Sequence, residues 1–337
     1  MKAWLLDELR GLRGLRLADV AEPVAGEGEV VLDLEYAALN PADRYLAENA
    51  YPGKPKLPHV LGRDGVGTIA VLGTGVSGFE IGQRVVIIRG DTGVNRWGSF
   101  AQQVAVSAQS IAVPPAGWNL QESAGAALVY LAAHQALTQW GELPPSVVLI
   151  TGASGGVGMA SIHLAKALGH TVVALSRDPG KREKLLAFGA DHVLDPADKQ
   201  WAVTLKKILA PRRVDLAVDN IGGPMFNPLL ETLGPWAKVS VVGALAGPVP
   251  QFNTPSLLFR RIRVGGVTLN SYSHVEAREA WEAIVKLLES SGARPVVDMV
   301  FSFDRLPAAF ERLAAGPLGK VLLEIRNSPT NAVGSGK

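Results

Sequence analysis

The stretch "TGASGGVG", residues 151–158, constrains the fold more than any other part of the chain. It follows the β-branched, apolar run "SVVLI" and precedes "MASIHLAKALG", in which Ile162, Ala165 and Leu168 recur at helical spacing. A strand, a glycine turn and a helix are typical of a site that cradles phosphate, because backbone N–H groups can approach the ligand there. Glycine-rich turns of this kind also occur for structural reasons alone.

Composition limits the classes of protein that this chain can belong to. Its 337 residues are 47% hydrophobic and 19% charged, which is typical of a globular protein with two domains. A net charge of +2 does not favour nucleic acid or membrane surfaces as partners. No cysteine is present, which excludes disulfides, thiolate metal ligands and iron–sulfur clusters. We find neither a signal peptide nor an apolar run of about 18 residues and expect a cytoplasmic location.

The pattern of apolar runs predicts an α/β protein with two domains. Residues 1 to about 120 contain short strand-like runs broken by Gly and Pro, which favours a β-barrel or sandwich. Residues 146–269 alternate six apolar strands with helical stretches, which indicates a doubly wound parallel sheet. We predict one domain at residues 123–270 and a second at 1–122 and 271–337, with disorder at 327–337.

Two families of reductase contain this sequence motif at the glycine turn. The short-chain dehydrogenases carry TGxxxGxG and pair it with a Tyr-x-x-x-Lys motif, in which the lysine lowers the pKa of the tyrosine. The residues four positions after the five tyrosines are Asn40, Asn49, Pro55, His134 and Glu276. Because none is lysine, the short-chain family is excluded.

The other family is similar over essentially the whole chain. Residues 40–86, residues 122–137 and "LLAFGADHVLD" at 185–195 resemble the medium-chain dehydrogenase/reductase superfamily, in the zinc-independent quinone oxidoreductase branch related to ζ-crystallin. This resemblance implies a Rossmann doubly wound parallel sheet plus a GroES-like β-barrel catalytic domain, with the active site in the cleft between them.

The resemblance also bears on metal. Zinc-dependent alcohol dehydrogenases of the same superfamily bind catalytic zinc with a cysteine where this chain has Asn40, and with a histidine where it has Arg63. An amide and a guanidinium do not replace a thiolate and an imidazole as ligands, so we predict a site without metal. His59 lies near this segment, and we interpret it as a structural residue.

Without a Lewis acid, reduction of an activated acceptor is easier than oxidation of an alcohol. We therefore expect hydride transfer to a quinone or an α,β-unsaturated carbonyl. The resemblance implies that Asn40, Tyr45 and Tyr51 face the substrate, where an amide or phenol can donate to a developing oxyanion. Asn40 is equally suited to cap a helix that begins at Pro41, and either tyrosine can simply pack in the fold.

We expect the cofactor to be NADPH. Ser176 stands where NAD-specific relatives carry an acid that binds the ribose, and Arg177 and Lys181 can bind a 2′-phosphate. Asp178 is an alternative ribose ligand, although its position favours a cap for the helix from Pro179. The predicted cofactor-binding residues are Gly152, Ser154, Gly155, Gly156, Val157, Ser176, Arg177, Lys181, Asn220 and Gly243.

Other interpretations of the sequence concern partners and alternative activities. The resemblance implies a homodimer that pairs the last strand of the Rossmann sheet, at residues 262–269, with its own copy, and an unpaired edge favours such pairing. An enoyl-thioester reductase is an alternative, with the basic cluster at residues 259–263 as its carrier site, and a NADPH-binding scaffold or regulatory protein with little activity is another. In the polar loop at residues 90–100, Trp97 either lines the active site or covers the barrel.

Overall fold

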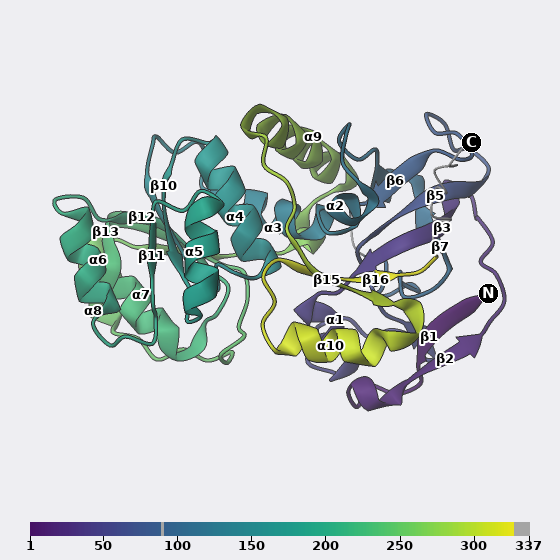
Figure 1. Ribbon diagram of the computed structural model, residues 1–337, viewed down its shortest axis with the longest axis horizontal. Helices are drawn as coiled ribbons and strands as arrows, with labels where there is room; N and C mark the ends of the chain where they lie inside the picture. Colours follow the sequence, from purple (N-terminus) through teal and green to yellow (C-terminus); the bar gives the residue numbers. More distant parts are fainter. Residues whose placement is uncertain (89–90, 327–337) are drawn as a thin grey trace, which may run out of the picture. The chain divides into compact units, whose positions relative to one another are not determined.

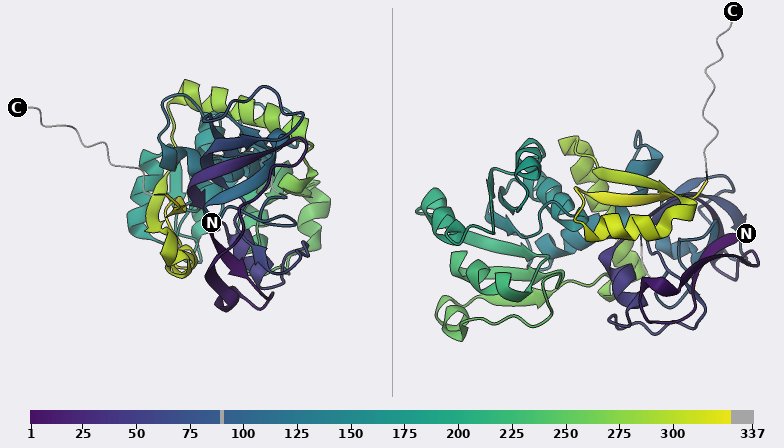
Figure 2. Two further views of the ribbon diagram at one scale, coloured as in Figure 1. Left: turned by 90° about the vertical axis from the view of Figure 1, so that its right-hand side faces the viewer. Right: turned by 60° about the horizontal axis from the view of Figure 1, so that its bottom comes forward.

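The computed structural model describes residues 1–88 and 91–326, which form two compact units (Figures 1 and 2). Unit 1 comprises Met1–Ala127, Met299–Ala315 and the chain from Val321, and unit 2 comprises Leu128–Asp298 and Gly316–Lys320. The predicted disorder at residues 327–337 and the first residue of the loop at 90–100 lie outside the described chain.

Unit 2 contains a six-stranded parallel sheet in the order β11-β10-β9-β12-β13-β14. This is the order of a doubly wound Rossmann sheet, and its strands are the six that the sequence predicted. The elements are α3 (Ala127–Thr138), β9 (Val147–Ile150), α4 (Gly156–Ala167), β10 (Thr171–Leu175), α5 (Pro179–Ala187), β11 (His192–Leu194), α6 (Trp201–Leu209), β12 (Val214–Asp219), α7 (Phe226–Thr232), β13 (Leu233–Val241), α8 (Thr254–Arg260), β14 (Arg263–Gly266) and α9 (His274–Ser291).

Helices cover both faces of this sheet (Figures 1 and 2). Successive residues of a strand point to opposite faces, and Leu149, Val173 and Val239 form one core cluster with α6 and α7. The intervening residues are also buried, and α4 packs against β9 and β10 there. Because both faces are covered, the central strands are continuous apolar runs rather than alternating ones.

The units divide at other positions than the sequence predicted. We expected the chain to leave the Rossmann domain at residue 270, whereas unit 2 continues to Asp298 and includes Gly316–Lys320. The physical reason is α9, whose apolar face packs against α4 of the Rossmann sheet. Ser273 begins this helix as an N-cap, accepting from the backbone N–H of Glu276.

Unit 1 is built mainly from antiparallel strands. The larger sheet has the order β15-β16-β3-β5-β6-β8, with β7 also paired to β3, and a smaller sheet has the order β2-β1-β4. This arrangement, with the Rossmann sheet of unit 2, is the predicted α/β fold with a GroES-like domain. The elements are β1 (Lys2–Leu6), β2 (Leu15–Asp19), β3 (Glu29–Ala38), α1 (Pro41–Ala47), β4 (His59–Val60), β5 (Gly65–Leu72), β6 (Arg84–Ile87), β7 (Gln103–Ser107), β8 (Ile111–Ala112), α2 (Leu120–Ala124), β15 (Val297–Ser302), α10 (Leu306–Ala314) and β16 (Lys320–Glu324).

The core of unit 1 joins segments from both ends of the chain. Leu32 and Ile69 of the large sheet pack in one cluster with Phe100 and with Phe310 of α10. The two phenylalanine rings meet edge to face with centroids 5.9 Å apart. Met299–Ala315 and the described chain from Val321 to Arg326 therefore belong to unit 1 with the N-terminal segment. Within the described chain, no helix combines the length and apolar composition needed to cross a membrane.

Candidate functional site

The glycine turn of unit 2 connects β9 to α4 at the carboxyl end of the sheet. Gly152 has a φ of +58°, a left-handed conformation that favours glycine. A Cβ on Gly158 would stand 2.5 Å from the carbonyl oxygen of Gly152 and 2.6 Å from Ala153. These two glycines are therefore required by the fold itself, the first for the turn and the second for close packing of helix and turn.

Gly155 differs from these two glycines because nothing in the fold crowds it. A Cβ there would meet only the carbonyl oxygen of Gly152, at 3.5 Å. Gly155 is the N-cap of α4, and no side chain caps this helix. The first turn thus presents uncapped backbone N–H groups, from Gly156 and Val157 onward, and the positive end of the helix dipole. A pyrophosphate group fits this arrangement.

The neighbouring strand ends are tied together by buried side chains. The hydroxyl of Thr151 donates to Asp219 Oδ1 at 2.7 Å, and Asn220 Nδ2 donates to the carbonyl oxygen of Thr151 at 2.8 Å. Gly243 approaches this network so closely that a Cβ would lie 2.7 Å from the carbonyl oxygen of Asn220. Asn220 and Gly243 therefore lie beside the glycine turn, and the network fixes the edge against which a nucleotide would lie.

The end of β10 carries the residues predicted to bind the ribose. Ser176 is buried and Arg177 is exposed. Asp178 Oδ1 accepts from the backbone N–H of Lys181 at 3.1 Å, which confirms Asp178 as the N-cap of α5. Lys181 Nζ donates to the carbonyl oxygen of Gly316 at 2.5 Å. Of the two cations predicted to bind the 2′-phosphate, Lys181 is thus engaged with Gly316, and the side chain of Arg177 is exposed to solvent at the end of the strand.

Two features near this strand end were missed by the sequence analysis. Arg182 donates to the carbonyl oxygens of Ser176 and Arg177 and pairs with Asp195, so it holds the turn after β10. The segment Gly316–Lys320 packs on the glycine turn, with the Gly319 N–H donating to the carbonyl oxygen of Ser154 at 2.8 Å. No local signal marks a segment so distant along the chain as part of this site.

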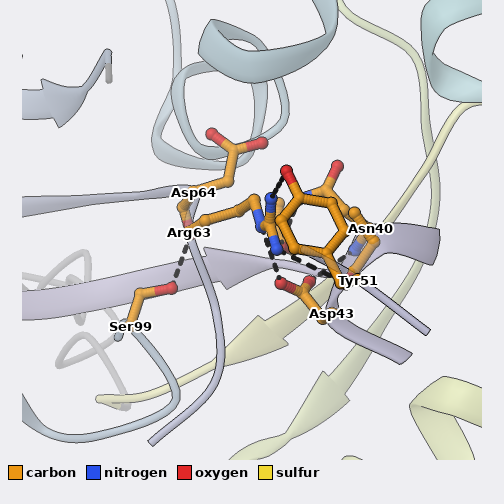
Figure 3. Close-up of polar contacts among 8 residues, drawn as sticks. Asn40, Asp43, Tyr51, Arg63, Asp64 and Ser99 are labelled. Carbon is orange, nitrogen blue, oxygen red and sulfur yellow. Dashed lines mark hydrogen bonds and ion pairs between the residues drawn. The ribbon is translucent and has the colours of Figure 1, made fainter. Parts of the chain in front are cut away.

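In unit 1, the conspicuous polar cluster surrounds Arg63 (Figure 3). Arg63 is 6% exposed and Asp43 is fully buried, and Arg63 Nε lies 3.2 Å from Asp43 Oδ1. Arg63 Nη1 donates to the Tyr51 hydroxyl at 3.1 Å, and Nη2 donates to the carbonyl oxygen of Ala42 at 3.4 Å. The guanidinium also lies 4.7 Å from the centroid of the Tyr51 ring. One buried cation therefore connects α1 to the segment that carries Tyr51.

The predicted substrate-facing residues have different relations to this cluster. Asn40 is the N-cap of α1, and its backbone N–H donates to Asp43 Oδ2 at 2.9 Å. Its side-chain amide donates to the carbonyl oxygen of Ala38 at 3.2 Å. Tyr45 lies on the same helix, where burial raises its pKa, but no hydrogen bond joins it to Arg63 in the described chain. The structure thus connects Asn40 and Tyr51 through Asp43 and Arg63, and leaves Tyr45 outside.

The polar loop at residues 91–100 contacts the segments that carry Arg63 and Tyr51. Gly62 has a φ of +95°, and its carbonyl oxygen accepts from the N–H of Ser99 at 2.8 Å. Val94 is buried and packs so closely on Gly53 that a Cβ there would lie 2.6 Å from its side chain. The indole N–H of Trp97 donates to the carbonyl oxygen of Pro58 at 3.2 Å. The loop therefore braces the turn that carries Arg63 and the segment that carries Tyr51.

Known protein families match segments of both units. Residues 26–116 match the family model "Alcohol dehydrogenase GroES-like domain", and residues 156–315 match the model "Zinc-binding dehydrogenase". The quinone oxidoreductase of Lama guanicoe is 28% identical over 334 residues, covering 97% of this chain and 98% of that protein. The chain belongs to the medium-chain dehydrogenase/reductase superfamily, among its quinone oxidoreductase-like members.

Solved structures of the superfamily have the same fold. An NAD-dependent alcohol dehydrogenase aligns with a TM-score of 0.89 at 25% identity, over 96% of this chain and 99% of that chain. A mycobacterial protein complexed with NADPH aligns with a TM-score of 0.87 at 25% identity, over 96% and 100% of the two chains. The protein is therefore an oxidoreductase of this superfamily.

The donor set does not fit zinc, although one matching model is named for zinc binding. Asn40 and Arg63, which the resemblance aligns with zinc ligands of zinc-dependent members, supply an amide and a guanidinium, and a protonated guanidinium repels a cation. Among the described residues, no group of three or more His, Asp or Glu side chains is arranged to hold a metal. His59 is buried on β4, and burial lowers its pKa.

Proposed function

We propose that this protein is a NADPH-dependent oxidoreductase that transfers hydride to a quinone or an α,β-unsaturated carbonyl without a metal. The observation that carries the proposal is the buried Arg63–Asp43 pair beside Asn40 and Tyr51. Hydrogen-bond donors and a fixed cation occupy the segment in which zinc-dependent relatives bind their metal. Such donors stabilise an oxyanion but do not generate an alkoxide from an alcohol as zinc does.

The fit of the nicotinamide cofactor rests on the residues of unit 2. When bound, NADPH supplies a hydride from C4 of its nicotinamide. The uncapped first turn of α4 binds the pyrophosphate, and Arg177 binds the 2′-phosphate, since Asp178 is engaged as a helix cap. Ser176 leaves no acid at the ribose that would repel a phosphate.

In unit 1, the side chains activate the acceptor. As hydride arrives, negative charge develops on a quinone or carbonyl oxygen, and the Tyr51 hydroxyl and the Asn40 amide are suited to donate to it. The Tyr51 hydroxyl already accepts from Arg63, so its own proton is free to be donated. A phenol in this position also supplies the proton that completes the reduction.

The basic cluster at residues 259–263 gives little support to the alternative activity, which is reduction of an enoyl thioester. Arg260 donates to the carbonyl oxygens of Leu230 and Leu233, at 2.8 and 2.9 Å. Arg261 stacks on Trp236, with its Cζ 3.8 Å from the ring centroid. Arg260 and Arg261 therefore have structural partners in unit 2, which disfavours a carrier-binding role for these two side chains.

The steady-state test is NADPH consumption with a panel of quinones and enones, together with elemental analysis. We expect turnover with at least one acceptor, no stoichiometric zinc and undiminished activity in chelator. Tight NADPH binding without turnover of any acceptor would favour the scaffold alternative. One zinc per chain, with activity lost in chelator, would contradict the metal-free site.

Cofactor preference is tested by Arg177→Ala. A hydrogen bond to a charged group contributes about 1.5 to 3 kcal/mol, so the variant should weaken NADPH binding about 10- to 150-fold. NADH binding should remain nearly unchanged, because NADH lacks the 2′-phosphate. Lys184→Ala, an exposed cation on α5, is the matched control. Equal loss of both cofactors in Arg177→Ala would contradict the assignment.

We further propose a homodimer that pairs β14 with its own copy. β14 is the last strand of the six-stranded sheet, so one edge of its backbone has no partner strand within the described chain. Leu258 and Phe259, just before this strand, are 69% and 81% exposed. An unpaired edge beside exposed apolar side chains suits a two-fold interface. Light scattering at micromolar concentration should give a dimer mass, and a monomer mass would contradict it.

A further inference from the structure

We propose that Arg63 is a positioning residue that orients the Tyr51 hydroxyl to donate its proton to the carbonyl oxygen of the acceptor. This inference rests on the proposed function, and it names the tyrosine that acts and the side chain that directs it. Arg63 bonds to Tyr51 as well as to Asp43. Its bonding pattern assigns it a role of its own (Figure 3).

The guanidinium is held on three sides. Nε donates to Asp43, Nη2 donates to the carbonyl oxygen of Ala42, and Nη1 donates to Tyr51. Both partners of the ion pair are nearly or fully buried, at 6% and 0% exposure, so water does not compete for these donors. A planar guanidinium bonded through three of its nitrogens has no freedom to rotate. Arg63 therefore has a fixed orientation relative to the groups that it contacts.

The direction of the Arg63–Tyr51 bond is determined by chemistry. A guanidinium carries only donors, so the Tyr51 hydroxyl must be the acceptor in this bond. The phenolic proton then points elsewhere, and no group in the described chain accepts it. A hydroxyl that receives a bond from a cation is also polarised toward donation. The geometry leaves a donor with a fixed oxygen and a proton available to a ligand.

The segment that carries Tyr51 is braced as well. Val94 packs on Gly53, and the Tyr51 ring lies against the Arg63 guanidinium at 4.7 Å. Tyr45 provides the contrast, because it is on the neighbouring helix but lacks a bond to Arg63. Of the two tyrosines predicted to face the substrate, Tyr51 is therefore the one with a positioned hydroxyl.

The kinetic test is a double-mutant cycle on Arg63 and Tyr51 in the full-length protein. Arg63→Lys keeps a cation beside Asp43, so the variant retains its buried ion pair, but it loses the fork that reaches Tyr51. Tyr51→Phe should lower kcat about 10²- to 10⁴-fold, as loss of a general acid does, with NADPH affinity unchanged. Arg63→Lys should lower kcat in the wild-type background and have little further effect when Tyr51 is already Phe. Arg44→Lys is the matched control, because Arg44 is an exposed arginine of α1 that pairs with Glu48, and it should retain kcat within about threefold.

Additive losses in the double variant would overturn the proposal, since two residues that act through one hydroxyl cannot contribute independently. A larger loss in Tyr45→Phe than in Tyr51→Phe would overturn it as well. Full kcat in Arg63→Lys would show that the fork is not needed.

A binding measurement separates this proposal from the proposed function. Cyclohexanone carries a carbonyl oxygen but no conjugated double bond, and its affinity for the NADP⁺-saturated protein can be measured by calorimetry. Tyr51→Phe and Arg63→Lys should each weaken it, and the double variant should be no weaker than Tyr51→Phe. This result would support the carbonyl subsite even if the wild type reduced no acceptor, an outcome that defeats the proposed function alone. Unchanged affinity in both single variants would overturn the subsite.

Discussion

The glycine turn of unit 2 and the Arg63 cluster of unit 1 present polar groups by opposite means. The turn presents backbone N–H groups, and its specificity lies in the absence of side chains at Gly152, Gly155 and Gly158. The cluster presents side chains, and it needs a buried ion pair to hold them. Burying backbone N–H groups at a helix terminus costs little free energy when a ligand accepts their hydrogen bonds. A buried charge, in contrast, is tolerated only beside a charge of opposite sign.

This difference predicts how each region fails when it is changed. A substitution in the turn acts through shape, because an added methyl group meets backbone or fills the space open to a ligand. A substitution in the cluster acts through charge, because it removes one member of a buried ion pair.

Arg63→Met should have the largest effect on stability. It removes the guanidinium that compensates the buried Asp43 carboxylate, which costs about 3–5 kcal/mol in the free energy of unfolding. Arg44→Met is the matched control, since Arg44 pairs with Glu48 on the same helix at 2.6 Å but is exposed. Its loss should cost less than about 1 kcal/mol. Urea unfolding of both variants measures the difference, and equal costs would show that burial does not set the value of the Arg63 pair.

Acid should destabilise unit 2 through His163. Burial lowers the pKa of His163 to about 4, and its Nδ1 lies 2.7 Å from the Tyr130 hydroxyl. The unfolded chain takes up this proton near pH 6.5, so the stabilisation is complete above that pH and is lost as pH falls toward 4. The loss amounts to about 3 kcal/mol at most.

The measurement is the pH dependence of unfolding for the wild type and His163→Gln. Glutamine stays neutral throughout, so the variant should lose less stability than the wild type between pH 7 and pH 4. Parallel curves would mean that His163 is not the group responsible. Hydrogen exchange would sharpen the comparison of units by showing whether α3 and α4 lose protection first.

Within the turn, two glycines should separate fold from binding. Gly158→Ala places a Cβ 2.5 Å from the carbonyl oxygen of Gly152, and such overpacking costs about 1–3 kcal/mol of stability without any cofactor. Gly155→Ala meets no such contact and should change the stability of the free protein by less than about 0.5 kcal/mol. Its methyl group should instead weaken NADPH binding about 5- to 150-fold. Thermal unfolding with and without NADPH distinguishes the two, and identical behaviour would refute the separation.

The same contrast explains how far sequence alone could lead. The six strands of unit 2, the turn at Gly152 and the cap at Asp178 are local patterns, and all were predicted. The Arg63–Asp43 pair joins residues 20 positions apart, and the sequence indicated only which metal chemistry Arg63 excludes. The boundary near residue 298 was missed because the amphipathic pattern of α9 shows that one face is buried but not against which helix.

Deuterium transfer tests most directly the claim that backbone binds the cofactor while side chains, not metal, activate the acceptor. NADPH deuterated at the transferred C4 position is mixed with an enone and metal-depleted protein, and the reduced product is analysed by mass spectrometry. We expect one deuterium at the β-carbon of the product, at the same rate before and after treatment with chelator. Absence of label in the product until zinc is added would contradict the claim.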